Sequence, residues 1–229
     1  MPHYIFEARV LKTRQGPIAG VDEVGRGPLA GPVVAGAVIL DRKRLPKGVD
    51  DSKQMVAEAR EEAYARIMEM AVAVGIGEAT VDEIDLVNIR QATHLAMARA
   101  IRALRLAPTF ALVDGNDPPA LPCPCDTIIE GDARSISIAS ASIIAKVTRD
   151  KMMVELDALH PGYGWLTNKG YATPEHLEAL DRLGPTRHHR RSFAPVHTIL
   201  YGGASQAEQI VGPTSLSPTI IAVDDTVAS

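Results

Sequence analysis

Apolar and polar positions alternate along the chain in segments that predict strands and helices in turn. Five short apolar runs predict strands, at 18–22, 33–40, 71–79, 109–113 and 127–129. A turn rich in proline and glycine joins the first two runs, so we expect them to pair as an antiparallel hairpin. The sheet is therefore predicted to be mixed.

Helical spacing of apolar residues marks the segments between these runs. Helices are predicted at 56–70, 88–106 and 140–160, of which the last is the longest. Thr80 and Glu83 have the spacing of a capping box, which indicates a helix start. Thr173 precedes a proline, which is typical of a helix N-terminus, and Gly184-Pro185 predicts the end of the same helix.

The order of these elements indicates one α/β domain, because strands and helices follow one another without a long linker or a repeat of fixed period. We place this domain at 18–201, after an N-terminal leader at 1–17. Residues 202–229 are small, polar and turn-rich and contain no lysine or arginine, so we expect a disordered tail there.

Composition narrows the cellular setting. The chain has 229 residues, of which 46% are hydrophobic, but no apolar run has the roughly 20 residues of a membrane helix. The first residues lack the features of a signal peptide, so a cytoplasmic protein is expected. Cys123 and Cys125 are the only cysteines and are interpreted as reduced thiols, with a redox or metal role as the alternative.

The charge is unevenly distributed. The formal net charge of -4 does not by itself indicate a nucleic-acid-binding protein. Residues 182–207, however, contain four arginines, three histidines and no acid. The block 187–191, with the sequence RHHRR, is suited to a nucleic-acid backbone; a cationic surface loop is the alternative.

Four carboxylates occupy positions where a β-like run gives way to a turn that contains glycine: Asp22, Glu23, Asp114 and Asp132. Acids that follow neighbouring strands can meet at one edge of a sheet. Alternation along a strand sends Asp22 and Glu23 to opposite faces, so we expect a break or bulge between them if both serve one site. Each acid could instead be an ordinary turn or cap residue.

Carboxylates without clustered histidine or cysteine suit hard cations such as Mg²⁺ or Mn²⁺. Two such ions can activate water and stabilise the leaving oxygen of a phosphodiester. A nucleotide cradle is the weaker alternative, because the glycine-rich segment 25–32 lacks both the Lys-Ser/Thr of a P-loop and the G-x-G-x-x-G spacing.

An ordered set of motifs between residues 18 and 195 resembles bacterial ribonuclease HII, the type 2 ribonuclease H. The motifs are GVDEVGRGPLAGPVVAGAVIL, DDSK, LVDGN, EGD, SIIAKVTRD, HPGYG, NKGYATPEH and HHRRSF. The resemblance implies a ribonuclease H-like fold with a mixed five-stranded sheet flanked by helices. It also implies a metal-dependent endonuclease that cuts the RNA strand of RNA·DNA hybrids.

The family is associated with single ribonucleotides embedded in duplex DNA, cut on their 5′ side to leave 3′-hydroxyl and 5′-phosphate ends. Ribonucleotide excision repair and DNA replication are the implied settings. The four acids named above map onto the catalytic, metal-binding acids of the family, with two Mn²⁺ or Mg²⁺ ions expected. By resemblance, metal and substrate phosphate are the partners of these buried charges.

The resemblance also implies a set of substrate-binding residues: Gly25, Arg26, Gly27, Lys53, Lys146 and Tyr171. The Gly-Arg-Gly backbone and the tyrosine are expected to sense the 2′-hydroxyl, the group that separates RNA from DNA. The two lysines are expected to contact phosphates. Without the motifs, each lysine would be interpreted as a solvated surface residue and the tyrosine as a half-buried core residue.

Two other functions are weighed against this interpretation. A catalytically silent RNA·DNA-binding module would gain nothing from a cluster of acids that faces phosphates. Ribonuclease HIII carries an additional N-terminal substrate-binding domain, for which the residues before Ile18 are expected to leave no room. A monomer is expected.

Overall fold

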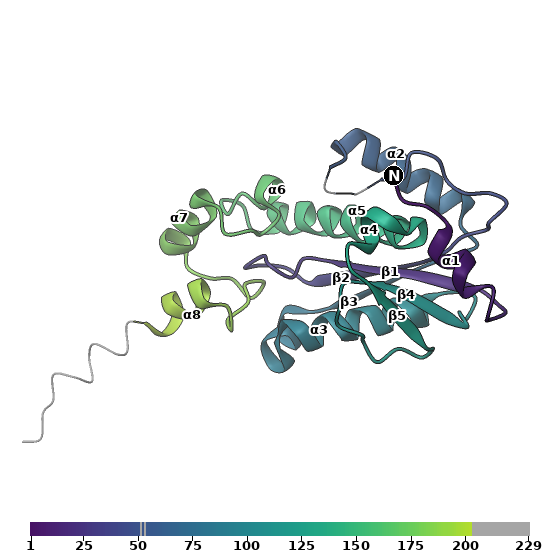
Figure 1. Cartoon of the computed structure of the whole chain (residues 1–229). Coiled ribbons are helices and arrows are strands. Elements are labelled where there is room, and N and C mark those ends of the chain that lie inside the picture. Colours follow the sequence, from purple (N-terminus) through teal and green to yellow (C-terminus); the bar gives the residue numbers. More distant parts are fainter. Residues whose placement is uncertain (51, 53, 203–229) are drawn as a thin grey trace, which may run out of the picture.

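The computed structural model describes residues 1–50, 52 and 54–202, which form a mixed five-stranded sheet with helices on both faces (Figure 1). The strands are β1 (Ile18–Val24), β2 (Val33–Ile39), β3 (Ala73–Ala79), β4 (Phe110–Asp114) and β5 (Cys125–Ile128), in the order β3-β2-β1-β4-β5. β2 is antiparallel to β1 and β3, whereas β1, β4 and β5 are parallel. The predicted mixed sheet and the predicted hairpin are confirmed. The expected tail at 202–229 lies outside the described residues except for Gly202.

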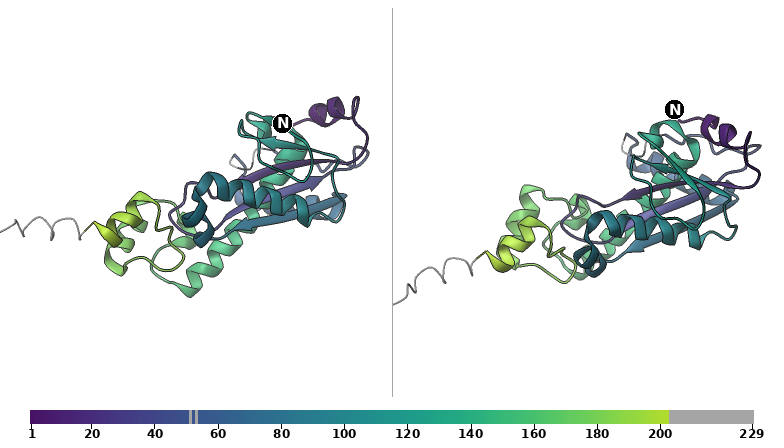
Figure 2. Two further views of the ribbon diagram at one scale, coloured as in Figure 1. Left: turned by 90° about the horizontal axis from the view of Figure 1, so that it is seen from below. Right: turned by 60° about the horizontal axis from the view of Figure 1, so that its bottom comes forward.

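Eight helices are found in the described part of the chain: α1 (Ile5–Val10), α2 (Ala57–Met70), α3 (Val81–Ala103), α4 (Gly131–Arg134), α5 (Ile136–Leu159), α6 (Trp165–Asn168), α7 (Pro174–Leu183) and α8 (Ala194–Tyr201). α5 packs on β1 and β2, and α3 packs on the other face against β2 and β3 (Figure 2). The helices α6, α7 and α8 lie beyond the β1–β2 hairpin (Figure 1). The sheet is thus covered on both faces, and its β1–β2 end abuts a separate helical cluster.

The helix boundaries follow their caps. The Thr80 capping box is present, with the Glu83 amide bonded to the Thr80 hydroxyl and the Glu83 carboxylate accepting from the Thr80 amide. α3 is interrupted at Asn88, whose φ is 68° and whose side chain accepts from the Gln91 amide at 3.1 Å. The predicted start at residue 88 therefore corresponds to the second segment of α3.

The long helix starts earlier than predicted, at Ile136 instead of residue 140. The reason is Ser135, whose hydroxyl accepts from the Ile138 amide at 3.3 Å and caps the helix. The additional turn lies directly against β1, because a side chain at Gly20 would overlap the Ser137 backbone. Gly36 has the same relation to Ala141. Two glycines thus let the α5 backbone rest on the sheet.

The leader is docked on the domain through α1. The Glu7 side chain is 1% exposed, and its Oε1 accepts from the hydroxyls of Ser135 and Ser137, each at 2.6 Å. Phe6 and Val10 of α1 pack against the apolar cluster that contains residues of β1, β4 and α5. The leader therefore secures the junction between α4 and α5, next to Asp132.

Cys123 and Cys125 are free and partly buried, and burial raises the pKa of both thiols. In the described ranges, no helix is both long enough and apolar enough to cross a membrane.

Candidate active site

The adjacent acids Asp22 and Glu23 lie near the carboxyl end of β1, without a break between them. β1 continues to Val24, with Asp22 opposite Gly36 and Glu23 opposite Ala35 in unbroken register. The expected bulge is therefore wrong. Asp22 faces α5, where the Ser142 hydroxyl favours its ionised form and opposes the rise in its pKa, and Glu23 faces α3. Both stay at one edge of the sheet because the strand ends one residue after Glu23.

The neighbouring parallel strand β4 brings Asp114 beside them. Val113 is the register partner of Val21, so Asp114 lies next to Asp22. The Gly131 amide donates to Asp114 Oδ1 at 2.7 Å, which ties the end of β4 to the start of α4. Asp132 is the next residue of α4 and is 6% exposed. The fold thus brings Asp22, Glu23 and Asp114 together at the carboxyl ends of β1 and β4, and Asp132 directly follows the glycine that bonds Asp114.

The site concentrates negative charge in a buried place. Burial, together with the charges of Glu23 and Asp114, raises the pKa of Asp22 well above its usual range. Burial also raises the pKa of Glu23, although Arg26 lies 3.2 Å from its carboxylate and opposes the shift. A bound cation would relieve this repulsion and favour the ionised carboxylates.

The residues fit a hard divalent cation by their donor chemistry. All four donors are carboxylates, the preferred ligands of Mg²⁺ and Mn²⁺. In the described ranges, however, no three acidic, histidine or cysteine side chains converge closely enough to hold a metal ion. Glu23 is turned toward Arg26 instead. The charge and the donors suit a metal, whereas the side chains lie further apart than coordination requires.

A small cavity of about 100 Å³ opens beside the acids on the α3 side. Glu23, Asp114 and the polar side chains of Arg90 and His94 line it. Asp117 accepts from the Arg90 guanidinium at 2.6 and 2.7 Å and lies 3.1 Å from His94 Nε2. The sequence interpretation missed this cluster, although the helical spacing of Arg90 and His94 could have indicated it.

A second cavity, of about 380 Å³, lies on the α5 side of Glu23. Its lining includes Ser52, Ser142, Lys146 and Tyr171. The structure therefore brings two of the predicted substrate-binding residues to the acidic edge. Lys53, the other predicted phosphate contact, lies outside the described residues.

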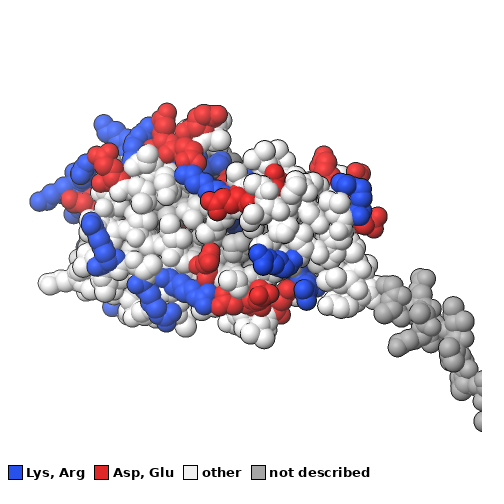
Figure 3. All heavy atoms as spheres, turned by 180° about the vertical axis from the view of Figure 1, so that it is seen from behind, with Lys and Arg blue, Asp and Glu red and all other residues white. Residues whose placement is uncertain are grey.

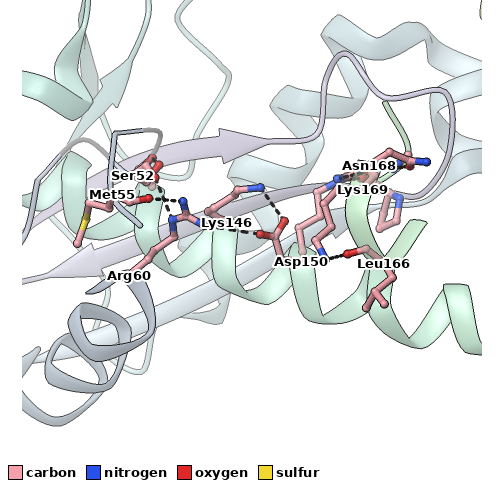
Figure 4. Close-up of polar contacts among 12 residues, drawn as sticks. Ser52, Met55, Arg60, Lys146, Asp150, Leu166, Asn168 and Lys169 are labelled. Atoms are coloured by element: carbon pink, nitrogen blue, oxygen red, sulfur yellow. Dashed lines mark hydrogen bonds and ion pairs between the residues drawn. The ribbon is translucent and has the colours of Figure 1, made fainter. Parts of the chain in front are cut away.

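Ion pairs hold the wall of this second cavity (Figure 4). Lys146 Nζ lies 2.7 Å from Asp150 Oδ1, one turn further along α5. Arg60 of α2 pairs with Asp150 at 3.8 Å and donates to the carbonyls of Ser52 and Met55 at 2.9 and 2.7 Å. The loop before α2 is thereby tied to the wall that carries Lys146.

The Gly-Arg-Gly segment lies opposite Tyr171. Arg26 and Gly27 are exposed, and a side chain added at Gly27 would meet the Tyr171 ring at 3.5 Å. Tyr171 is itself 45% exposed. The predicted 2′-hydroxyl sensors therefore face one space, at the rim of the cavity that Glu23 lines.

The basic block 187–191 is only partly a surface feature. His189 and Arg190 are both fully buried, so the expected contact with a nucleic-acid backbone is wrong for these two residues. Arg187 and Arg191 are exposed. On the face drawn in Figure 3, basic and acidic side chains are interspersed.

The buried histidines form a neutral chain of hydrogen bonds with Trp165. The indole N–H of Trp165 donates to His176 Nε2 at 3.0 Å, and His189 Nε2 lies 3.2 Å from the same atom. The Thr186 amide donates to His189 Nδ1 at 3.0 Å. Burial, followed by the neighbouring histidines, lowers the pKa of His189 to about 3.

Acid is therefore expected to destabilise the protein through His189. Its pKa is about 3 in the folded chain and about 6.5 when unfolded, so the unfolded state binds the proton first. Stability is complete above about pH 6.5 and falls toward pH 3, by up to about 1.4 kcal/mol per pH unit for this group. Urea denaturation between pH 7 and pH 5 measures the slope. His189→Gln should flatten it; equal slopes in both proteins would contradict the assignment.

Comparison with known proteins gives one consistent result. A family model described as Ribonuclease HII matches residues 19–196. The chain is 56% identical over 201 residues to a protein of Ruegeria pomeroyi named Ribonuclease HII. The match covers 87% of this chain and 86% of that protein.

Solved structures agree with the fold. The crystal structure of the ribonuclease H2 from Pyrococcus horikoshii superposes with a TM-score of 0.69 at 26% identity, over 80% of this chain and 97% of that one. A crystal structure of Bst-RNase HIII in complex with Mn²⁺ superposes with a TM-score of 0.66 at 22% identity, over 82% of this chain and 70% of that one.

Proposed function

Because the chain belongs to the ribonuclease HII family, whose members are type 2 ribonuclease H endonucleases, we propose the following reaction for it. It hydrolyses the RNA strand of RNA·DNA hybrids and cuts duplex DNA on the 5′ side of single embedded ribonucleotides. The products carry 3′-hydroxyl and 5′-phosphate ends. The observation that supports this most is the meeting of Asp22, Glu23 and Asp114 at the ends of β1 and β4.

The proposed cofactor is Mn²⁺ or Mg²⁺, held by Asp22, Glu23, Asp114 and Asp132. Mutual repulsion among buried carboxylates supports this assignment, and Mn²⁺ is present in the Bst-RNase HIII structure. When bound, two such ions would activate a water and stabilise the leaving oxygen. The chain itself supplies the oriented carboxylates, with Asp22 bonded by the Glu23 amide and Asp114 bonded by the Gly131 amide.

Substrate recognition is proposed to use the rim of the larger cavity. The amides of the Gly-Arg-Gly segment and the Tyr171 side chain would contact the ribose, where the 2′-hydroxyl can donate and accept hydrogen bonds. Lys146 would contact a phosphate, and Lys53 is proposed for the same role. The Lys146 side chain is 22% exposed and paired with Asp150, so a phosphate would share or replace that carboxylate as its partner.

Removing the Tyr171 hydroxyl should weaken cutting at single ribonucleotides while leaving the fold intact. The ring is 45% exposed, so Tyr171→Phe disturbs little packing. One lost hydrogen bond contributes about 1 kcal/mol, which corresponds to a roughly fivefold lower kcat/KM. Steady-state cleavage of a duplex with one ribonucleotide measures this, with the thermal midpoint as the control. An unchanged rate would remove Tyr171 from the site.

The function itself is tested with a labelled DNA duplex that contains one ribonucleotide, incubated with Mg²⁺, with Mn²⁺ and with chelator. A single cut on the 5′ side of the ribonucleotide, present only with metal, is the expected result. Binding of the duplex without any cut would favour a binding module instead. A cut at deoxynucleotides would contradict the proposed specificity.

The remaining aspects of the function are proposed from the family alone. The protein would act as a monomer in the cytoplasm, on RNA·DNA hybrids and ribonucleotide-containing duplexes. Ribonucleotide excision repair and DNA replication are the processes that present such substrates.

A further inference from the structure

Two arginines are buried behind the Gly-Arg-Gly segment and form no salt bridge with any described residue. Arg149 of α5 and Arg190, between α7 and α8, are both fully buried. Burial lowers the pKa of Arg149 to about 10 and that of Arg190 to about 9, so both remain charged at neutral pH. A buried charge is costly unless its donors are satisfied, so their hydrogen bonds identify their role.

Both guanidinium groups donate to backbone carbonyls of one loop, residues 25–32. Arg190 donates to the carbonyls of Gly25, Arg26 and Gly31, at 2.5, 2.9 and 2.8 Å. Arg149 donates to the carbonyls of Ala30 and Pro32, at 3.0 and 2.9 Å. The rigid, forked guanidinium can hold several acceptors in one geometry. These two side chains therefore determine which way the loop backbone faces.

At its Gly-Arg-Gly segment, the loop turns carbonyls inward and amides outward. The carbonyls of Gly25 and Arg26 are occupied by Arg190. Among the described residues, the amides of Arg26 and Gly27 have no hydrogen-bond partner, and both residues are exposed. Two donors are thus presented to solvent on an ordered backbone, opposite Tyr171.

The same brace reaches the segment that carries Tyr171. Arg149 also donates to the Lys169 carbonyl at 3.0 Å, and the Leu29 amide donates to the Gly170 carbonyl at 2.7 Å. The loop and the tyrosine segment are therefore fixed relative to each other by one guanidinium and one backbone bond.

The loop has little freedom to shift away from this brace. Gly25 has a φ of 93° and Gly31 a φ of 81°, values that favour glycine. Side chains at these two positions would overlap Arg149 and Met153, respectively. The Gly31 amide is also bonded to the His188 carbonyl at 2.9 Å. Glycine at positions 25 and 31 therefore lets the loop backbone lie close against Arg149 and Met153.

We infer that Arg149 and Arg190 are positioning residues for ribose recognition: by holding loop 25–32 against the Tyr171 segment, they determine how strongly the enzyme prefers a ribonucleotide over a deoxynucleotide. The inference rests on the proposed function, because it needs the Gly-Arg-Gly amides to contact the substrate ribose. Neither arginine touches the reacting atoms. Substituting either arginine should therefore lower the preference for a ribonucleotide, in addition to any loss of stability.

The test compares the affinities of two duplexes that differ only in one 2′-hydroxyl. The variants are Arg190→Lys and Arg149→Lys, which keep the charge but cannot bond all the carbonyls at once. Binding is measured at a temperature well below the thermal midpoint, in an Asp114→Asn background that prevents cutting. We expect the preference for the ribonucleotide duplex to fall about tenfold, because a change of this size corresponds to the loss of one or two hydrogen bonds. Affinity for the all-DNA duplex should stay within about twofold of the parent.

Arg102→Lys, on the exposed end of α3, is the matched control and should keep the full preference. If both buried variants also keep the full preference, the inference is overturned. If the unmodified protein does not cut the ribonucleotide-containing duplex and does not prefer it over DNA, the proposed function has failed first.

Hydrogen exchange in the unmodified full chain covers the case in which the variants do not fold. The amides of Leu29 and Gly31 should exchange slowly without substrate, because the braced loop keeps them bonded to Gly170 and His188. Exchange at the rate of an unprotected loop would show that the loop is not held, and would overturn the inference.

Discussion

Asp114→Asn is expected to abolish cleavage while leaving the fold intact. Asparagine keeps the Oδ1 acceptor that the Gly131 amide uses, so the contact between β4 and α4 survives. The negative charge is lost, and with it the stabilisation that a bound ion provides to the reaction, which is several kcal/mol. Since each 1.4 kcal/mol is tenfold in rate, cleavage should fall about 10³-fold or more.

The measurement is single-turnover cleavage of the ribonucleotide-containing duplex, together with calorimetric titration of Mn²⁺. Metal affinity should fall with the rate, whereas the thermal midpoint in chelator should be equal or higher, because the charge of Asp114 repels Asp22. Asp126→Asn, on the exposed side of β5, is the control and should resemble the parent. A variant that cuts at the parental rate would exclude Asp114 from the metal site.

Gly20→Ala is expected to have the largest effect on stability. The added methyl group would overlap the Ser137 and Ile138 backbone, which cannot rotate away as a side chain could. α5 must then move off β1. Overpacking of this kind costs about 1–3 kcal/mol and sometimes more, and a backbone overlap belongs at the upper end.

Thermal and urea unfolding measure the loss, and Gly27→Ala is the control for stability. At Gly27 a methyl group makes only an ordinary contact with the Tyr171 ring, so the free energy of unfolding should change by less than about 0.5 kcal/mol. Equal stability of the two variants would show that α5 does not rest on the strand as described. Cleavage by Gly20→Ala should also fall, since displacement of α5 moves Ser142, which favours the ionised form of Asp22.

The sheet and the acids could be predicted because their signals are local. Apolar runs and caps identified the strands and helices, and the ordered motifs indicated the family. The relation of Asp22 to Glu23 was predicted less well, since alternation correctly separates the two side chains but does not show that β1 ends after them. At the end of a strand, two side chains that point to opposite faces can both lie at the same edge of the sheet, so no bulge is needed.

The buried arginine and histidine in the basic block could not be predicted from composition. Arg190 is satisfied by carbonyls more than 150 residues earlier in the chain, and His189 by Thr186 and His176. The docking of Glu7 on Ser135 and Ser137 depends on similarly distant partners. Charged residues are usually exposed, so only the tertiary structure shows which of them have buried acceptors.

Helix α5 links the acids to loop 25–32, which we propose contacts the ribose. Ser142 favours the ionised form of Asp22, Lys146 lines the cavity, and Arg149 holds loop 25–32. Arg149 comes seven positions after Ser142, which places it about 10 Å further along the helix at about 1.5 Å per residue, and a continuous helix does not stretch. This continuous helix therefore sets the spacing between the acids and the loop proposed to contact the ribose. We expect the enzyme to cut at a constant offset from any ribonucleotide, whatever the surrounding sequence.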